Sequence, residues 1–405
     1  MSGTDVEIAD IVREHGEAYL ERFGHCTPWQ HKRVLLDIAR CRTAAMGGHV
    51  DVCTECGLLR CAYNSCRNRH CPKCLGSARW RWTQLREAEL LSVPYFHVVF
   101  TLPQELAPLA LGNQRVVYSL LFKAVAQTLS EVAADPKHLG AKIGFLAVLH
   151  TWGQKLNHHP HVHCVVPGGG LSPDGSRWIS ARPDFFLHVK VLGEVFRGKF
   201  LDMLFRAYTA GLINCSGKLA PLRNRSCFKR LLAQAKRHDW VVYSKPPFGG
   251  PAQVVRYLAR YTHRVAIANY RILALANGLV TFRYKDYADN NRIKAMTLPA
   301  LVFIRRFLMH VLPGGFTRIR YYGLMANRDR GRNLALCRQR IAEADISPAP
   351  VPVAPTEEPL ELPAPIDPAR CPACRAQSMK LLRTYARPFL APEILARPTL
   401  AWDTS

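Results

Sequence analysis

The sequence contains no uninterrupted apolar run near twenty residues, which is the length that a helix needs to cross a bilayer. Its first residues, MSGTDVEIADIVREHGEAYLERFG, mix acidic and apolar side chains and lack the basic start and apolar centre of a secretory signal. These two absences argue against a membrane span and against export. We therefore expect no membrane partner and a cytoplasmic location.

Acidic residues are scarce relative to basic ones. The 405 residues include 30 Asp and Glu against 55 Lys and Arg, which leaves a formal net charge of +25. A surplus of this size makes a compact chain repel itself unless the charge meets a polyanion, so the composition favours a phosphate-rich partner. The alternative is a generically basic protein without such a partner. The length is sufficient for two or three domains.

Although no export signal is visible, the chain has 14 cysteines, and most of them cluster. In a reducing compartment this indicates metal ligands rather than disulfides. Two C-x-x-C pairs, Cys53–Cys56 and Cys71–Cys74, match the arrangement in which each pair supplies two thiolates to one tetrahedral zinc. Because residues 52–75 are too poor in apolar side chains to fold on a core of their own, we expect a structural zinc ion to hold them.

The zinc ligand set stays open in the sequence. Cys61, Cys66 and His70 lie between the two pairs, and they are compatible with a replaced ligand or with a second site. A further pair, Cys371 and Cys374, forms half a zinc site, since no other pair follows it. The basic residues around the first pairs favour contact with phosphate; they are Arg67, Arg69, Lys73, Arg79 and Arg81.

The spacing of apolar residues predicts a helical N-terminal segment followed by alternating strands and helices. Helical spacing covers residues 1–49. The next expected elements are a strand at 95–103, a helix at 115–136, and strands at 143–152 and 161–170. A split βαβ sandwich, in which helices pack on one antiparallel sheet, has this order of elements. We therefore expect an α+β fold.

The remainder of the chain contains three further expected elements and a linker. The elements are a helix at 228–240, a strand at 278–288 and a helix at 301–313. Residues 347–368 are rich in Pro, Ala and Glu, which is typical of an extended linker. The expected division is a helical and zinc-binding module at 1–90, a catalytic domain at 91–340, a linker at 341–370 and a short tail at 371–405.

A histidine pair on the expected strand 161–170 is the first candidate for chemistry. Side chains two residues apart on a strand share a face, so His161 and His163 point together while Val162 faces the core. Two imidazoles in this arrangement can hold a divalent ion and leave positions open for substrate oxygens. Gln154 is the candidate third ligand, with His150 behind it. The alternative is that these are structural histidines.

A pair of tyrosines four residues apart, Tyr257 and Tyr261, is the second candidate. One helical turn separates them, and cationic residues surround them; these are Arg256, Arg260, His263 and Arg264. A phenol is a weak nucleophile until it is deprotonated, and guanidinium groups lower that cost while they also bind phosphate. Such a pair could attack phosphodiesters twice. The alternative is core packing of aromatic residues.

Four stretches occur along the chain in a defined order: C-R-N-R-H-C-P-K-C, H-P-H-V-H, R-Y-L-A-R-Y-T-H-R and F-R-Y-K-D-Y. Together they resemble the rolling-circle transposases of the insertion sequence 91 family, which are HUH endonucleases with two catalytic tyrosines. The resemblance covers roughly residues 41–340. Any one of these motifs is weak, whereas four in register are highly specific.

The resemblance implies an HUH-type split βαβ catalytic domain preceded by a helical and zinc-ribbon-like module. In it, His161 and His163 would hold Mg²⁺ or Mn²⁺, and Gln154 would be the third ligand by analogy with related HUH enzymes. Tyr257 and Tyr261 would be the alternating nucleophiles. The family's zinc module maps onto Cys53, Cys56, Cys71 and Cys74, and the expected phosphate contacts are Arg256, Arg260, Arg264, Arg283 and Lys285.

The implied activity is transposition. The enzyme would nick and rejoin single-stranded DNA at the ends of an insertion sequence through 5′-phosphotyrosine intermediates. Its partners would be the element ends, the target DNA and the host replication machinery, in the bacterial cytoplasm near the nucleoid. The alternatives are a plasmid replication initiator or relaxase of the same chemistry, and a non-catalytic zinc-ribbon DNA-binding protein. No DDE carboxylate triad is apparent in the sequence.

Overall fold

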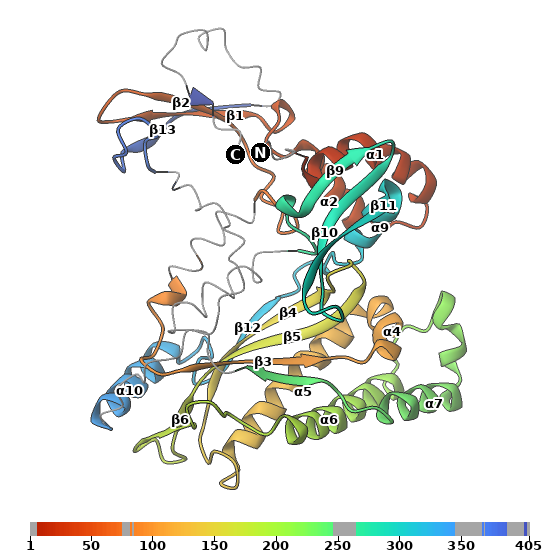
Figure 1. Cartoon of the computed structure of the whole chain (residues 1–405), viewed down its shortest axis with the longest axis vertical. Helices are drawn as coiled ribbons and strands as arrows, with labels where there is room; N and C mark the ends of the chain where they lie inside the picture. The colour runs from red at the N-terminus through yellow and green to blue at the C-terminus, as the bar shows by residue number, and fades with distance from the viewer. Residues whose placement is uncertain are drawn as a thin grey trace.

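The structure is a computed structural model that describes residues 6–74, 82, 85–245, 265–344, 367, 369–386 and 401–402. Figure 1 shows three bodies in these residues: a large sheet with helices on it, a smaller body of helices and strands above it, and a separate small sheet that contains β1, β2 and β13. Both helices and antiparallel sheets are present, so the expected α+β class is confirmed.

The largest sheet has five strands in the order β12-β4-β5-β3-β8, and every neighbouring pair is antiparallel. Its strands are β3 (Tyr95–Thr101), β4 (Gly144–Trp152), β5 (His158–Pro167), β8 (Val242–Lys245) and β12 (Ile319–Gly323). The two central strands, β4 and β5, consist mostly of buried residues. Because both faces of these strands are covered over most of their length, they contain apolar runs rather than a simple alternation.

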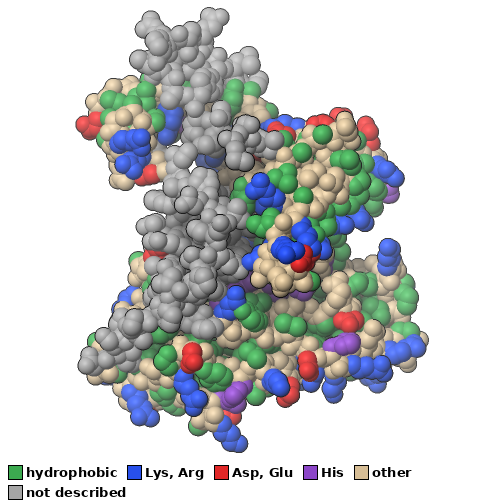
Figure 2. All heavy atoms as spheres, viewed as in Figure 1, with side chains coloured by type: hydrophobic (Ala, Val, Ile, Leu, Met, Phe, Trp, Pro, Cys, Tyr) green, Lys and Arg blue, Asp and Glu red, His purple; other side chains and the backbone are tan. Residues whose placement is uncertain are grey.

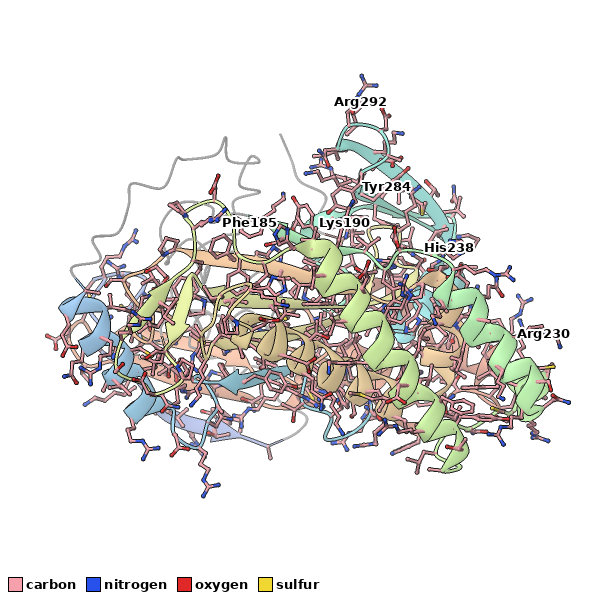
Figure 3. The ribbon with its side chains drawn as sticks, turned by 90° about the horizontal axis from the view of Figure 1, so that it is seen from below. Phe185, Lys190, Arg230, His238, Tyr284 and Arg292 are labelled. Atoms are coloured by element: carbon pink, nitrogen blue, oxygen red, sulfur yellow. The ribbon has the colours of Figure 1, made fainter. Side chains whose placement is uncertain are left out.

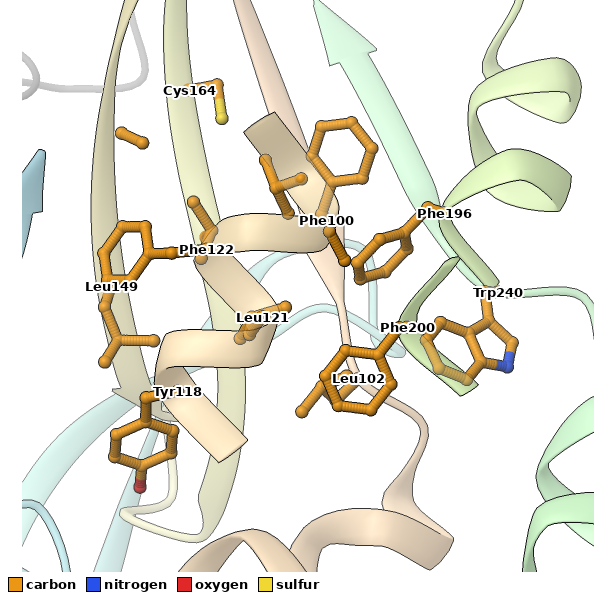
Figure 4. Packing of buried hydrophobic residues seen from close by; sticks show 14 of the residues in the cluster. Phe100, Leu102, Tyr118, Leu121, Phe122, Leu149, Cys164, Phe196, Phe200 and Trp240 are labelled. Carbon is orange, nitrogen blue, oxygen red and sulfur yellow. The ribbon is translucent and has the colours of Figure 1, made fainter. Parts of the chain in front are cut away.

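Helices cover one face of this sheet (Figure 1). The two long ones are α5 (Gln114–Ala134) and α6 (Val189–Thr209), with the shorter α4 (Ala107–Gly112) and α7 (Arg225–Lys236) beside them. Figure 4 shows the packing: Leu121 and Phe122 of α5 and Phe196 of α6 lie among side chains from the strands, and all three are fully buried. Burying one such side chain stabilises the fold by about 2 kcal/mol.

Helix α5 is long and apolar enough to cross a membrane by length and composition alone. Of its most apolar window, 56% is buried inside the protein. The core between the sheet and α6 accounts for its apolar character, because Val117, Leu121, Val125 and Leu129 are all buried there. We therefore assign α5 to the core.

Among the described residues, α10 (Arg330–Glu343) packs on the opposite face of the sheet. Leu334, Cys337 and Ile341 of α10 pack with Leu146, Val148 and Val165 of the sheet. A short hairpin of β6 (Gly169–Leu171) and β7 (Trp178–Ser180) lies beside them. The expected strand 161–170 begins earlier, at His158, and divides at Gly168. A side chain at Gly169, which has φ +151°, would collide with the indole of Trp178.

The second body combines the N-terminal helices with a later part of the chain. Its elements are α1 (Ile8–Phe23), α2 (Trp29–Arg40), α9 (Ala300–Leu308) and a three-stranded sheet of β9 (Ile272–Ala276), β10 (Leu279–Asp286) and β11 (Arg292–Pro299). Ile8 and Ile38 share one buried core with Phe282 and Phe303. The expected domain boundary at residue 90 therefore separates residues that pack together.

The third sheet joins two distant parts of the chain. It consists of β1 (Gly48–Cys53), β2 (Leu59–Tyr63), β13 (Met379–Tyr385) and β14 (Ala401–Trp402), in the order β13-β1-β2-β14. Short 3₁₀ turns complete the described elements, at Ala44–Met46, Gln104–Leu106, Gly217–Arg223 and Asn269–Arg271. The sequence analysis did not anticipate strand pairing between the N-terminal module and the tail.

Most of the expected elements are found close to their expected bounds. The strands expected at 95–103, 143–152 and 278–288 correspond to β3, β4 and β10. The helices expected at 115–136, 228–240 and 301–313 correspond to α5, α7 and α9. In each of these segments the apolar residues recur with a clear period of two or 3.6 residues. This period was sufficient to predict the type of element.

Candidate functional site

Three histidines gather on the sheet face opposite α5. His150 of β4 is the cross-strand partner of His161 on β5, and His163 lies two residues further along β5 on the same face. One ring nitrogen from each lies within 4.8 Å of the other two. The group thus has the residue types and spacing that suit one divalent metal ion. Val162, between the two β5 histidines, is fully buried on the α5 side, as expected.

Burial keeps the imidazoles of His161 and His163 neutral. Desolvation lowers the pKa of His161 to about 3 and the pKa of His163 well below its ordinary value, and the neighbouring histidines lower both further. A protonated imidazole cannot bind a metal, whereas the neutral ring has a lone pair available. At neutral pH His161 and His163 are therefore in the protonation state that metal binding needs.

One hydrogen bond decides which nitrogen of His161 is available. Its Nδ1 lies 2.7 Å from the carbonyl oxygen of His159, so Nδ1 carries the proton and donates it. Nε2 is then the lone-pair nitrogen of the neutral ring. A backbone carbonyl that fixes the tautomer of a histidine in this manner is the usual second partner of a metal ligand.

His97 of β3 supports His163 in the same way. Its Nε2 lies 2.7 Å from Nδ1 of His163, and the two rings are parallel within 3° at a centroid distance of 4.9 Å. His97 is itself buried, and desolvation lowers its pKa to about 4. The sequence analysis missed His97. Side chains alternate along β3, and Phe96 and Val98 face the core. This alternation already indicated that His97 lies on the opposite face.

We expect His97→Phe to weaken binding of Mn²⁺ by about 10- to 100-fold, because the ring of His163 loses the partner that orients it. His97→Gln keeps a side-chain hydrogen-bonding group and should recover part of the affinity. Isothermal titration with Mn²⁺ measures the effect. If His97 were only a core residue, both variants would lower the melting temperature and leave the affinity of the folded protein unchanged.

Gln154, the expected third ligand, has other partners. Its side-chain nitrogen donates to the hydroxyl of Tyr287 at 3.2 Å, and its side-chain oxygen lies 3.5 Å from the backbone N–H of Lys285. His150, which was expected behind Gln154, has a ring nitrogen close to those of His161 and His163. The bend between β4 and β5 separates Gln154 from the ladder that aligns His150 with His161.

Both predicted nucleophiles, Tyr257 and Tyr261, lie outside the described residues, as do Arg256, Arg260 and Arg264. The described strand that leads toward them is β8, which pairs with β3 so that Lys245 lies opposite His97. Lys245, the last described residue before the tyrosines, therefore lies beside the strand that carries His97.

The other two predicted phosphate contacts lie on the three-stranded sheet. Arg283 and Lys285 alternate on β10 with Phe282, whose side chain is in the core, and Arg283 is exposed. Figure 3 shows Tyr284 of β10 and Arg292 of β11 where this sheet projects from the body. Lys155, next to Gln154, lies 4.9 Å from the ring centre of Tyr284. Cationic and aromatic groups thus alternate at this end, a composition that suits single-stranded nucleic acid.

The predicted zinc site of Cys53, Cys56, Cys71 and Cys74 is divided between two groups, which corrects the expected ligand set. The first group consists of Cys41, Cys66, Cys71 and Cys74. The second consists of Cys53, Cys56, Cys371 and Cys374. Each C-x-x-C pair was recognised correctly, but its partners were not the nearest pair in the sequence. The strand pairing between β1 and β13 brings the cysteine pair of the tail, Cys371 and Cys374, close to Cys53.

The first group lies inside the core of the second body, where Cys41 and Cys71 are fully buried. The Sγ of Cys74 lies 3.5 Å from the Sγ atoms of both Cys41 and Cys66. Four thiolates around a zinc at 2.3 Å are separated by about 3.8 Å, so the sulfurs are close to the required tetrahedron. Hydrogen bonds from Cys66 and Cys71 lower the pKa of Cys41 to about 7, which favours the thiolate.

Of the three residues left open by the sequence, Cys66 belongs to this first group, and Cys61 and His70 do not. The Nε2 of His70 accepts a hydrogen bond from the backbone N–H of Leu312 at 3.1 Å, and burial lowers its pKa to about 3. Two basic residues of the same loop also make contacts within the protein. Arg69 donates to the carbonyl groups of Pro313 and Phe316, and Lys73 pairs with Glu7 at 2.6 Å.

The surface is predominantly basic. Figure 2 shows Lys and Arg side chains spread over both large bodies, with fewer Asp and Glu between them. This agrees with the formal charge of +25. A basic surface, a metal-competent histidine group and cysteine groups suited to zinc define a protein that acts on nucleic acid.

Two family models match the chain. The model described as "Putative transposase" matches residues 144–332, which include the three histidines of the metal-competent group. The model described as "Transposase zinc-binding domain" matches residues 11–102. The class of the protein is thus a transposase with a zinc-binding domain, and zinc is a structural component of the chain.

Two curated relatives give the same result. The chain is 48% identical over 411 residues to "Putative transposase y4qJ" of Sinorhizobium fredii (strain NBRC 101917 / NGR234), with 100% of both chains covered. It is 29% identical over 345 residues to "Transposase for insertion sequence element IS801" of Pseudomonas savastanoi pv. phaseolicola, with 83% of this chain and 80% of the relative covered. No solved structure matches the chain significantly. The chain belongs to the insertion sequence 91 family of transposases.

Proposed function

We propose that the protein nicks and rejoins single-stranded DNA at the ends of an insertion sequence, in rolling-circle transposition through 5′-phosphotyrosine intermediates. The observation that carries this proposal is the group of His150, His161 and His163 on an otherwise apolar sheet. Buried imidazoles are costly to place in a core, and a metal-dependent reaction gives them a role.

The central sheet fits an HUH-type catalytic domain. Its two middle strands, β4 and β5, are adjacent and antiparallel, and they present the histidines on one face while α5 and α6 cover the other. Side chains on rigid central strands keep their positions better than side chains on loops. We assign the DNA strand to the histidine face of the sheet, next to the three imidazoles.

The proposed chemistry combines the histidine group with the two tyrosines. A divalent ion, Mg²⁺ or Mn²⁺, would supply Lewis-acid polarisation of the scissile phosphate. The phenol oxygen of Tyr257 or Tyr261 forms a bond to phosphorus and loses its proton to solvent. The bond from phosphorus to the 3′ oxygen breaks, and that oxygen takes up a proton. The resulting ester conserves the bond energy, so the reverse reaction rejoins strands without ATP.

The DNA contacts are assigned to the basic residues near this face. Arg283 and Lys285 of β10, together with Arg256, Arg260 and Arg264, are proposed to bind phosphates. The aromatic side chains of Tyr284 and Tyr287 lie near cations at the projecting end of the three-stranded sheet, where unpaired bases can stack. The released 3′-OH would prime synthesis by the host replication machinery in the bacterial cytoplasm.

Incubation with end-labelled single-stranded element ends and Mg²⁺ or Mn²⁺ tests the proposal. Label at the 3′ end should remain on the denatured protein, whereas label at the 5′ end should appear in a shorter free strand with a 3′-OH. The polarity of the adduct distinguishes this chemistry from one with a 3′-phosphotyrosine. Tyr257→Phe and Tyr261→Phe should each change adduct formation, and the double variant should abolish it.

Tyr243→Phe is the matched control, because Tyr243 is a half-exposed tyrosine on β8 that has no part in the proposed chemistry. Adduct formed by the double variant would show that the nucleophile lies elsewhere. A wild-type protein that binds the DNA but never forms adduct would instead be a DNA-binding protein without this activity.

A further inference from the structure

The tail of the chain forms a second cysteine group together with the N-terminal zinc module. Cys371 and Cys374 lie beside Cys53 and Cys56, and the four sulfurs are all within 4.8 Å of one another. The zinc-binding family model ends at residue 102, so it contains only two of these four cysteines. From the sequence, the tail pair was half a site without a partner.

The distances between sulfurs suit a metal and not disulfides. The Sγ atoms of Cys53 and Cys374 are 3.6 Å apart, and those of Cys56 and Cys371 are also 3.6 Å apart. A disulfide would bring two sulfurs to about 2.05 Å. Four thiolates bound to one zinc at 2.3 Å are about 3.8 Å apart, which is close to the observed spacing.

The backbones of the two pairs repeat the same loop. In the first, the N–H of Cys53 donates to the carbonyl of Leu58 at 2.9 Å, and the N–H of Gly57 donates to the carbonyl of Cys53 at 3.0 Å. In the second, Cys371 donates to Ala376 at 2.8 Å, and Arg375 donates to Cys371 at 3.0 Å. The residue after each pair has a left-handed backbone, with φ 72° at Gly57 and φ 64° at Arg375.

The left-handed conformation is informative at Arg375 because it is unfavourable for a residue with a side chain, by about 1 kcal/mol or more. Something must therefore hold the loop in this shape. A shared metal does so, since two equivalent loops with N–H groups near the sulfurs are the form in which C-x-x-C pairs bind zinc. The N–H of Cys56 lies 3.4 Å from the Sγ of Cys53, as expected for such a loop.

Ser378 adds a further contact between the tail and the module. Its hydroxyl lies 3.0 Å from the Sγ of Cys53. The backbone N–H of Thr54 also donates to the carbonyl of Ser378 at 3.0 Å. Both contacts place Ser378 directly beside the cysteine group.

Apolar burial does not account for the attachment of the tail. Strand β13 pairs with β1 from Gly48↔Tyr385 to Cys53↔Met379, yet its side chains are mostly exposed, including Leu381 at 64% and Leu382 at 59%. A strand with so little buried surface is held weakly by its backbone hydrogen bonds alone. The buried residues at the start of the tail are Cys371 and Ser378, and both lie at the cysteine group.

We propose that Cys53, Cys56, Cys371 and Cys374 bind a second zinc ion, which joins the tail to the N-terminal module and closes a ribbon of strands β13, β1 and β2. The zinc-binding unit of this transposase then consists of both ends of the chain. This inference does not depend on the proposed DNA chemistry, because the metal and the attachment can be measured without DNA.

Metal analysis of the full-length protein tests the stoichiometry. The wild type should hold two zinc ions per chain, and Cys371→Ser/Cys374→Ser should hold one. Cys26→Ser is the matched control and should hold two, because Cys26 is exposed and belongs to neither cysteine group. A wild type with one zinc, or a double variant that still holds two, would overturn the proposal.

A second measurement addresses the attachment directly. A protease recognition sequence inserted between residues 351 and 362 allows the chain to be cut between the body and the tail. With zinc present, the tail peptide should stay with the body through size-exclusion chromatography, and a chelator should release it. In Cys371→Ser/Cys374→Ser the peptide should separate without chelator. A wild-type peptide that dissociates while zinc is bound would also contradict the proposal.

Discussion

Replacement of His161 by alanine is expected to abolish metal-dependent cleavage, with a loss of about 1,000-fold or more. The ring of His161 is one of three imidazoles whose nitrogens converge, and Lewis-acid polarisation of a phosphate is worth several kcal/mol. His163→Ala should have a similar effect. Cleavage of labelled single-stranded DNA in Mn²⁺, together with Mn²⁺ affinity from calorimetry, measures both quantities on the same preparation.

The same assay decides between His150 and Gln154 as the third ligand. His150 lies in the histidine group, whereas the side chain of Gln154 contacts Tyr287 and the backbone of Lys285. We therefore expect His150→Ala to lower the affinity for Mn²⁺ far more than Gln154→Ala. His138→Ala controls for the loss of a histidine as such, since His138 lies in the loop after α5 and does not belong to the histidine group. The reverse order of effects would restore Gln154 as the ligand.

Substitution of Cys71 by serine should unfold the body formed by α1, α2, α9 and the three-stranded sheet. Cys71 is 1% exposed and lies in the same buried core as Ile38 and Phe303. A structural zinc contributes about 10 kcal/mol or more, which is comparable to the whole stability of a domain. We expect the zinc content to fall by one ion per chain and limited proteolysis to digest this body first.

Cys61→Ser is the control for that experiment. Cys61 is also buried, at 3% exposed, and it lies on β2 in the zinc-binding module, but it belongs to neither cysteine group. Its replacement should leave the zinc content unchanged and lower the stability by about 1–3 kcal/mol, which is the cost of a buried hydroxyl. Equal behaviour of the two variants would show that the first group holds no structural zinc.

Loss of zinc from the first cysteine group should affect the stability of the protein more than loss of zinc from the second. The first lies in a core that also contains residues from α9 and β10, so its loss disturbs packing over a whole body. The second lies at one end of a small sheet whose outer strand is largely exposed. Loss of the second zinc should free the tail and leave the melting transition of the remainder nearly unchanged.

Several features of this protein could be predicted from local patterns in its sequence. The α+β class followed from apolar periods, and the placement of His161 and His163 on one face followed from the period of a strand. Each C-x-x-C pair was also recognisable, because its two cysteines are brought together by a short loop that the spacing itself specifies. The four motifs in register identified the family before any contact was known.

Only the tertiary structure decided which distant residues meet. The antiparallel register of β4 and β5 places His150 across from His161, and that of β3 and β5 brings His97 within hydrogen-bonding distance of His163. The pairing of β1 with β13 joins Cys53 to a cysteine pair more than 300 residues later. Periods in a sequence specify which face a side chain occupies, but they contain no information on which strand will be its neighbour. That choice depends on the free energy of the whole packed chain.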